Sequence, residues 1–480
     1  MKNSIGRYKH ISNLVYSFIL FITTSITSQE KSDLLFYRKN SITIEGQLQA
    51  GVNAVGETNL FWNLADVPEL DFDSDTEWLE LYAKPGLTFY HNFKSNSHIY
   101  AKISGVGSYT WGVDAFDAKN TGRITLEDAY MGYRFRITDS VLVDVSIGSQ
   151  PLKLGTGMLI SNGASSGFER GALKFGPRKA WQKTILGKVS ENKFNSTFFY
   201  LAPNELPSND TDNELAGLDV NYFVSKERDI GLSYIRVINS KAPYPQAAPN
   251  GEGPPTITAG DRKNLNALNL YSKINLLGKS LHKLSLGMDV AYQFNPTIDL
   301  SSLGGRLQLA YLFPKVSWKP TLMYSYQFFS GDNPDTNNQE RFDPLYFEGS
   351  PSSWSTGSKS SMVFINSNVQ SQGITFQVRP SSSDIITLRY AHIAAQQLRS
   401  PIQFGQAARV EFSNEIPTVI AGVTNSHLAD DVFIEYNKII GKHLFFNAGF
   451  SISFPGKGIR NITNSTSNWT GGFLNFVINY

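Results

Sequence analysis

A G-x-S-x-G spacing is the first pattern in this sequence whose residue types could carry covalent chemistry. It spans residues 163–167 and centres on Ser165. In hydrolases this spacing exposes a serine hydroxyl on a strand-to-helix turn beside an oxyanion hole. No helical spacing follows it here, so a flexible Gly/Ser loop explains it better. A hydrolase at the rim of a β-protein would also need a histidine partner, for which His392 and His427 are candidates.

Alternating carboxylates at Asp71, Asp73 and Asp75 resemble the start of a calcium-binding loop, because they offer hard oxygen ligands. The segment lacks the glycine expected at the sixth position, and Tyr82 stands where the twelfth-position glutamate would be. An acidic lip is the alternative, since the window 51–80 carries eight acids and no lysine or arginine. The seven histidines show no clustered ligand spacing, so we predict no transition-metal site and no cofactor.

The strongest local charge lies in the window 149–183, which has six cations against the single anion Glu169. If this long basic segment folds into a pore, low-dielectric walls focus its field and concentrate anions. A solvated loop paired with the acidic lip is the open alternative. The candidate constriction residues are Lys153, Arg170, Lys174, Arg178 and Lys179.

Composition excludes several classes of function. The 480 residues include no cysteine, which rules out disulfides, thiolate zinc sites, iron–sulfur clusters and cysteine nucleophiles. The formal net charge is only +2, so no global field draws the protein to nucleic acid. Charged residues make up 18%, below the roughly 25% of soluble domains, while there are 22 Tyr and 32 Phe. We find no nucleotide-binding motif.

The first residues have the order of a secretory signal peptide. Lys2, Arg7 and Lys9 precede the apolar run 14–22, and small polar residues follow to Ser28. An N-terminal anchor helix is the alternative, but the apolar run is too short to span a bilayer. We therefore predict a signal peptide over residues 1–28 and one exported domain over residues 29–480.

Strand-like segments with a period of two recur from residue 41 to the end of the chain. Eight very short polar turns alternate with nine longer loops rich in Gly, Pro, Asn and Asp, and the tally is about eighteen strands. In a soluble β-sandwich, nothing requires short and long connections to alternate along the chain. A bacterial outer-membrane barrel has short periplasmic turns and long extracellular loops. The pattern predicts an all-β chain: a single transmembrane antiparallel β-barrel of about 18 strands.

Alternation within strands assigns the two faces. In 79–89, Leu79, Leu81 and Leu87 share one face with other apolar residues, while Glu80 and Lys84 lie on the other. In a barrel the apolar face meets lipid and the polar face lines the lumen. The predicted lumen cations are Lys84, Lys102, Arg134, Arg306, Arg379 and Arg389, and the predicted lumen acids are Glu80, Asp144, Asp219, Asp289 and Glu435. Arginine there offers a flat, permanent charge that suits carboxylates, although some pairs would be structural salt bridges.

The end of the chain supports the barrel over an exported sandwich. The last strand places Leu474, Phe476, Ile478 and the terminal Tyr480 on one face. Phe473, Asn475, Val477 and Asn479 lie on the other. This ending resembles the signal that the barrel-assembly machinery reads in outer-membrane proteins. Closure also leaves no edge strand, which is the one β solution in lipid.

Two segments carry a family resemblance. Residues 148–161 read GSQPLKLGTGMLIS, and residues 341–347 read RFDPLYF. They are similar to segments of the alginate export family of outer-membrane channels. The resemblance implies an eighteen-stranded barrel with an arginine-lined lumen and loops that constrict it. Ser149 and Met158 stand where the family motif has arginines, so we widen the expected solute from alginate to anionic saccharides.

We therefore predict a passive outer-membrane channel for anionic polysaccharides, oligosaccharides or similar solutes, and not an enzyme. Its expected partners are outer-membrane lipid, the assembly machinery and the solute, with a periplasmic partner left open. A general diffusion porin, a barrel with a surface binding or hydrolase role, and a soluble exported sandwich or adhesin are the alternatives. Solubility without detergent would favour the last.

Overall fold

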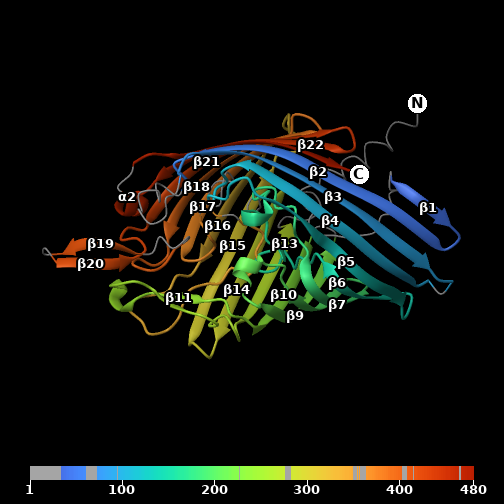
Figure 1. Cartoon of the computed structure of the whole chain (residues 1–480), viewed down its shortest axis with the longest axis horizontal. Helices are drawn as coiled ribbons and strands as arrows, with labels where there is room; N and C mark the ends of the chain where they lie inside the picture. The colour runs from blue at the N-terminus through green and yellow to red at the C-terminus, as the bar shows by residue number, and fades with distance from the viewer. Residues whose placement is uncertain are drawn as a thin grey trace.

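A computed structural model gives the structure of the protein (Figure 1). It describes residues 34–60, 73–94, 96–225, 228–275, 283–349, 354, 356, 364–402, 408–413, 416–463 and 466–480. The predicted signal peptide, residues 1–28, lies outside the described residues, as does Asp71 of the predicted calcium loop.

Almost all of the regular secondary structure in the described chain is β-strand. The strands in its first half are β1 Leu35–Lys39, β2 Ile42–Thr58, β3 Thr76–Asn92, β4 His98–Gly112, β5 Gly122–Arg136, β6 Val141–Gln150, β7 Trp181–Glu191, β8 Phe194–Ala202, β9 Glu214–Ser225, β10 Arg228–Asn239, β11 Tyr244–Gln246 and β12 Thr256–Thr258. Those in its second half are β13 Asn266–Asn275, β14 Leu284–Asn295, β15 Leu300–Leu312, β16 Thr321–Phe329, β17 Val369–Val378, β18 Asp384–Ala395, β19 Ala408–Ser413, β20 Ile416–Ala421, β21 His427–Ile440, β22 Leu444–Pro455 and β23 Trp469–Asn479. The helices are α2 Lys457–Thr463 and the 3-10 turns η3 Phe168–Arg170, η4 Pro207–Asn209 and η5 Pro249–Gly251.

Eighteen of these strands form one closed antiparallel barrel. Each strand pairs with the next barrel strand along the chain, and β2 closes the ring by pairing with both β3 and β23. β1 lies beside the start of β2, and the short pairs β11–β12 and β19–β20 form two separate two-stranded sheets that are not part of the ring. The predicted barrel is confirmed, and the soluble-sandwich alternative is wrong because the sheet closes on itself.

The two ends of the barrel differ as the loop lengths predict. Short turns such as 137–140 and 441–443 join strands at one end, while long segments such as 151–180 and 330–368 join them at the other. In outer-membrane barrels the short turns face the periplasm and the long loops face outward. No helix among the described residues is long and apolar enough to cross a membrane.

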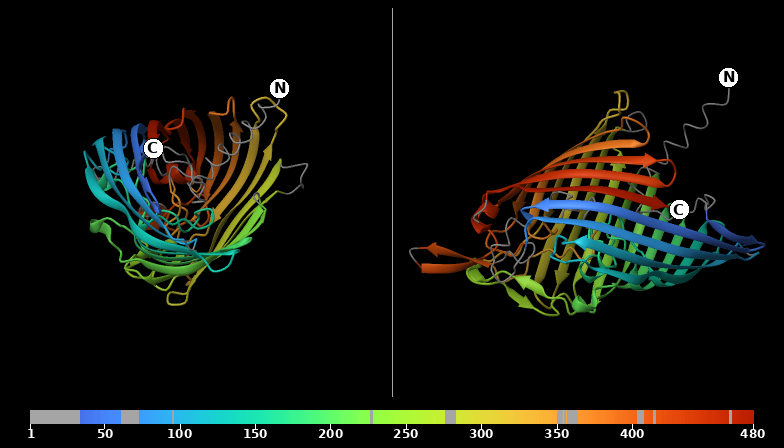
Figure 2. Two further views of the ribbon diagram at one scale, coloured as in Figure 1. Left: turned by 90° about the vertical axis from the view of Figure 1, so that its right-hand side faces the viewer. Right: turned by 45° about the horizontal axis from the view of Figure 1, so that its top comes forward.

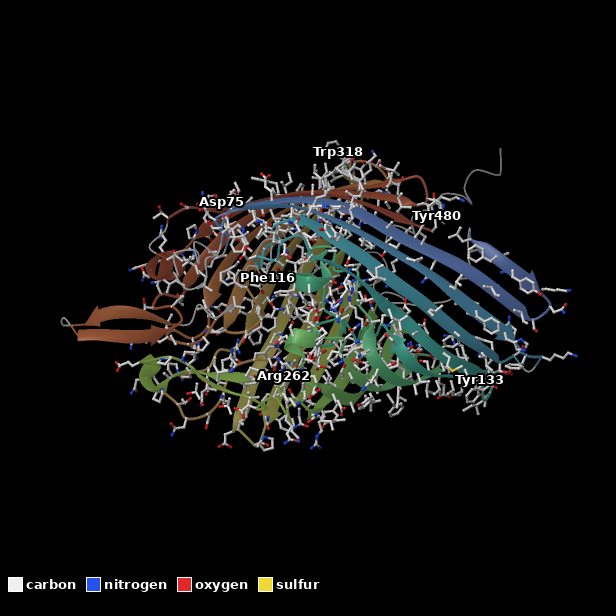
Figure 3. All side chains as sticks on the ribbon, viewed as in Figure 1. Asp75, Phe116, Tyr133, Arg262, Trp318 and Tyr480 are labelled. Atoms are coloured by element: carbon white, nitrogen blue, oxygen red, sulfur yellow. The ribbon has the colours of Figure 1, made fainter. Side chains whose placement is uncertain are left out.

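The outer wall is apolar, with aromatic side chains near both ends. Leu87, Leu307 and Ile374 are exposed on it. Aromatic side chains are exposed near the short-turn end at Phe93, Tyr133, Phe194, Phe313, Trp318 and Tyr480, and near the long-loop end at Trp111, Tyr292 and Phe454. Figure 3 labels three of them, Tyr133, Trp318 and Tyr480. Such girdles flank the lipid-facing band of outer-membrane barrels. The strand faces therefore match those read from the sequence.

The packed core lies inside the ring. Looking along the barrel, coil segments lie inside the ring of strands (Figure 2, left). Leu154, Met158 and Ile160 from one long loop are buried in the same apolar cluster as Phe342 and Trp354 from another. Residues of the long loops thus form much of the packed interior. The packing of these loops against each other positions the candidate site described below.

Candidate constriction site inside the barrel

Two long loops meet inside the barrel. We call residues 151–180 the basic loop and residues 330–368 the second loop. Ile160 and Tyr346 form a parallel bridge between them, and the Tyr346 amide donates to the Leu159 carbonyl at 2.9 Å. The Glu348 amide donates to the Gly157 carbonyl at 2.9 Å. The two segments that carry the family resemblance therefore contact each other, although they are far apart in the sequence.

The basic loop reaches the middle of the barrel wall at its Gly-Thr-Gly turn. Gly155 and Gly157 have positive φ values of 50° and 83°, which glycine adopts without strain. A side chain at Gly155 would press on the ring of Tyr271, since its Cβ would lie 2.8 Å from two ring carbons. The turn directs the Thr156 hydroxyl to Asp289 Oδ1 at 2.8 Å, halfway along β14. The loop therefore contacts the inner wall at mid-height.

Glu80 of β3 holds the basic loop by its backbone. This wall carboxylate is fully buried. Its Oε1 accepts hydrogen bonds from the Lys174 amide and from Trp78 Nε1, each at 2.8 Å, and its Oε2 accepts one from the Phe175 amide at 2.9 Å. An ionised acceptor makes such bonds stronger than neutral ones. Glu80 was predicted as a lumen acid, and the structure shows what it binds.

Glu127 of β5 makes a second, similar clamp. Its Oε1 accepts hydrogen bonds from the amides of Lys179 at 2.7 Å and Ala180 at 3.1 Å, and from Lys84 Nζ at 3.1 Å. Its side chain is only 1% exposed. A predicted lumen cation, Lys84, therefore neutralises the charge that holds the loop.

The cations of the basic loop point to protein oxygens. Arg170 donates to the carbonyls of Ser165, Asn204 and Glu205 and to the Asn204 side chain at 2.7–3.0 Å. Arg178 donates to Thr125, Ser108 and the Arg123 carbonyl. Lys153 pairs with Glu348 at 2.8 Å, Lys174 lies 3.9 Å from Glu57, and Lys179 donates to Asn162 at 3.0 Å. Arg170, Lys174 and Arg178 thus contact the wall strands or a neighbouring loop, Lys153 contacts the second loop, and Lys179 contacts the basic loop itself.

Three of the predicted lumen cations face the lumen beside acids, Lys84 at mid-height and Lys102 and Arg134 nearer the short-turn end. Lys84 and Lys102 both approach Asp128, at 3.9 and 3.2 Å. Arg134 binds Asp144 through two nitrogens. These three side chains keep 18–24% of their surface exposed to solvent.

The other three predicted cations lie on the opposite side of the ring. Arg306 is buried with its guanidinium 3.8 Å from the ring centre of Trp354 in the second loop, so it supports that loop. The guanidinium of Arg389 lies 5.5 Å from the ring centre of Phe433, a buried residue directly opposite it on β21. Arg379 follows the end of β17 at the short-turn rim, where it donates to Gln377 at 3.4 Å.

Glu127 and Asp128 were missed by the sequence analysis, and a β-bulge explains why. The pairing of β4 with β5 shifts between Ile103 and Gly105, so the ladder has one extra residue in β5. A bulge re-aims side chains. Both consecutive acids are therefore buried, whereas strict alternation would place one of them on the lipid face.

Asp114 is a buried acid of the neighbouring outer loop 113–121. Its Oδ1 accepts hydrogen bonds from the amides of Phe116 and Ala118, and its Oδ2 is buried without a hydrogen-bond partner. Burial raises the pKa of Asp114 to about 6, with smaller contributions from the charges of Glu80 and Asp117 and against those two hydrogen bonds. Phe116 stacks on Phe168 of the basic loop at 5.1 Å, which joins this loop to the site.

The other sequence candidates fall elsewhere. Asp73 and Asp75 accept hydrogen bonds from backbone amides of their own turn and of Asn59, and Asp71 lies outside the described residues. Ser165 lies in the basic loop, where its carbonyl binds Arg170 and a three-residue 3-10 turn, η3, follows. His392 and His427 lie on the outer wall, where both bind Asp430.

Comparisons with known proteins bear on the fold. The structure is similar to that of Acinetobacter baumannii OccAB2, with a TM-score of 0.51 and 8% sequence identity, over 91% of this chain and 98% of that chain. Acinetobacter baumannii OccAB4 has a TM-score of 0.49 at 9% identity, over 91% of this chain and 98% of that chain. Pseudomonas aeruginosa OccK7 (OpdD) has a TM-score of 0.47 at 8% identity, over 92% of this chain and 99% of that chain. No protein-family model and no curated protein sequence matches the chain.

The closed ring and its apolar outer wall define an outer-membrane β-barrel, and OccAB2 has the same fold. The protein is located in the bacterial outer membrane. Membership of the alginate export family stays a prediction, since the comparisons support the barrel class only.

Proposed function

We propose that this protein is a passive outer-membrane channel for anionic, saccharide-like solutes, and that the basic loop and the second loop form its constriction. The observation that carries the proposal is the clamping of the basic loop inside the barrel by Glu80, Glu127 and Asp289. A loop fixed at mid-height sets the width of the path, and lumen charge then selects among the solutes that fit. A concentration gradient supplies the driving force.

The short-turn half of the lumen supports the choice of solute. The cations Lys102 and Arg134 face it beside Tyr100 and Tyr130, whose ring centres lie 6.2 Å apart. The Tyr100 hydroxyl binds Asp144 at 2.5 Å, so this wall combines cations, aromatic faces and hydroxyl groups. Cations attract uronate carboxylates, and ring faces with hydroxyl groups suit sugar rings.

A general diffusion pore is the second candidate, and the ion pairs favour it. Lys84, Lys102 and Arg134 each lie within 4 Å of an acid, so the net field along this wall is weaker than its cations alone would give. A pore of this kind would pass small solutes of either sign with little preference.

Single-channel recording of the refolded protein in a planar bilayer tests the proposal. We expect anion-preferring conductance steps that added oligouronates block, and larger steps after removal of residues 163–178 from the basic loop. Steps without anion preference and without block would establish the general pore in its place. A folded barrel without conductance, with or without residues 163–178, would contradict both candidates.

A further inference from the structure

A cluster of two histidines and one aspartate lies on the outer wall near the long-loop end. His392 is in β18, and His427 and Asp430 are in β21. His392 Nδ1 lies 2.9 Å from Oδ1 of Asp430, and His427 Nε2 lies 2.8 Å from its Oδ2. The three side chains are 30–43% exposed. Within the described residues this is the one group of three His or acidic side chains whose ligand atoms converge, all within 4.8 Å of one another.

A local irregularity of the sheet brings this cluster together. Asp430 is directly opposite His392 in the β18–β21 ladder, which places both on one face. His427 is three residues before Asp430, and a regular strand would put it on the opposite face. The pairing shifts between Ile393 and Ala394, so the extra residue in β21 turns His427 to the same side as Asp430.

Neighbouring groups hold the cluster in place. The Tyr390 hydroxyl donates to Asp430 Oδ1 at 2.7 Å, as second-shell groups of metal sites do for their carboxylate ligands. Gly456 lies against His427, and a Cβ on it would come within 2.3 Å of the His427 carbonyl oxygen and 2.7 Å of its ring. The chain after β22 therefore packs directly on this histidine because residue 456 has no side chain.

We propose that His392, His427 and Asp430 bind a divalent transition-metal ion of the Zn²⁺ class on the outer wall of the barrel. Imidazole nitrogens with one carboxylate oxygen form a common three-ligand set for zinc and leave a fourth position for water. Ligand atoms about 2.1 Å from the metal lie about 3.4 Å apart in a tetrahedron. The two imidazole rings are stacked with their centres 4.8 Å apart, so both rings must turn for one nitrogen of each to point at the same ion, and their partial exposure leaves room for this.

The position of the site indicates what a bound metal does. The segment 396–426 leaves β18 just after His392 and returns to β21 just before His427, and it carries the hairpin of β19 and β20 that projects from the barrel (Figure 1). A metal held by both histidines would add a link between β18 and β21 at a point where the two strands already pair. The site faces away from the lumen, so it is independent of the proposed solute path.

Titration of the purified, folded barrel in detergent with Zn²⁺ at pH 7.5 tests the proposal, with isothermal calorimetry as the measurement. We expect one Zn²⁺ per chain, and at least tenfold weaker binding for His392→Gln and for Asp430→Asn. Tyr390→Phe keeps all three ligands and removes only the hydrogen bond to Asp430, so it should weaken binding by roughly 10- to 100-fold while preserving the fold. His443→Gln is the matched control, because His443 lies in the turn before β22 at the opposite end and stacks on Tyr480.

Two further measurements identify the ligand atoms. Co²⁺ in place of Zn²⁺ should give visible absorption bands that disappear in His427→Gln, and an excess of Ca²⁺ should not displace Zn²⁺, because calcium prefers oxygen ligands. If the wild type, His392→Gln, His427→Gln and Asp430→Asn all bind Zn²⁺ with equal affinity, the proposal is overturned, and the cluster is a carboxylate hydrogen-bonded between two imidazoles. Displacement of Zn²⁺ by Ca²⁺ would also overturn it.

Discussion

The clamp that Glu80 makes on the basic loop gives a sharp test of whether that loop is held in the barrel as the structure indicates. In Glu80→Gln, one carbonyl oxygen can still accept from Trp78 and Lys174, but an amide NH₂ then faces the Phe175 amide. One charge-assisted hydrogen bond is lost, which costs about 1.5–3 kcal/mol. Since about 1.4 kcal/mol is tenfold, the undocked fraction of the loop should rise roughly 10- to 100-fold.

Limited proteolysis with trypsin measures this fraction, because the basic loop contains five lysines and arginines that are buried or partly buried while it is docked. When the loop recloses faster than it is cut, the cleavage rate follows the undocked population. We therefore expect cleavage within residues 151–180 to accelerate by the same factor, while the barrel strands remain intact. Conductance in a bilayer should become larger or noisier in the same variant.

Glu435→Gln is the matched control. It makes the same change of charge on the lumen face, but Glu435 lies on β21, where it accepts from Asn447 at 2.9 Å. We expect this variant to be cleaved at the wild-type rate. If Glu80→Gln is cleaved no faster than Glu435→Gln, the clamp does not hold the loop and the reasoning fails.

Three more predictions concern selectivity, pH and assembly. Replacing Arg379 and Arg389 by Glu should lower the anion preference in reversal-potential measurements, and an unchanged preference would show that neither charge acts on the solute path. Because the folded-state pKa of Asp114 is raised to about 6, the folded protein binds this proton more tightly than the unfolded chain, so this carboxyl stabilises the fold increasingly as pH falls from 6 towards 4. Asp114→Asn should have a higher unfolding temperature than the wild type at pH 7.5, and its unfolding temperature should rise less as the pH falls from 6 towards 4. Identical dependence of the unfolding temperature on pH in the two proteins would refute this. Deleting Tyr480 removes its ring and its two backbone hydrogen bonds with Leu48, so less barrel should reach the outer membrane, whereas Tyr480→Phe should assemble normally; normal assembly of the deletion would argue against a role for the terminal aromatic residue.

The sequence by itself was enough to predict the barrel. Strand side chains alternate with a period of two, so a lipid-facing and a lumen-facing set can be read from segments such as 79–89 without any tertiary information. The alternation of short turns with long loops predicted the two different ends of the barrel. The structure confirms the eighteen strands and the lumen-facing position of Glu80 and Asp289.

The course of the long loops could not be read in this way. The charge of the basic loop fits an inward fold and a solvated loop equally well. Contacts with groups distant in the sequence, such as Asp289 and Glu348, decide that the basic loop folds inward. No local pattern signals that Ile160 pairs with Tyr346, because their pairing depends on the closure of the whole ring.

Bulges mark the other limit of the sequence. One extra residue in β5 turns both Glu127 and Asp128 inward, and one in β21 turns His427 outward beside Asp430. A bulge breaks the period of two on which every assignment of a face depends. The amino-acid sequence thus determined a closed barrel with a polar lumen and an apolar wall, because those follow from local alternation. Only the tertiary structure decided which charges hold the loops inside and which side chains converge on the outer rim, because those depend on register and on contacts between distant strands.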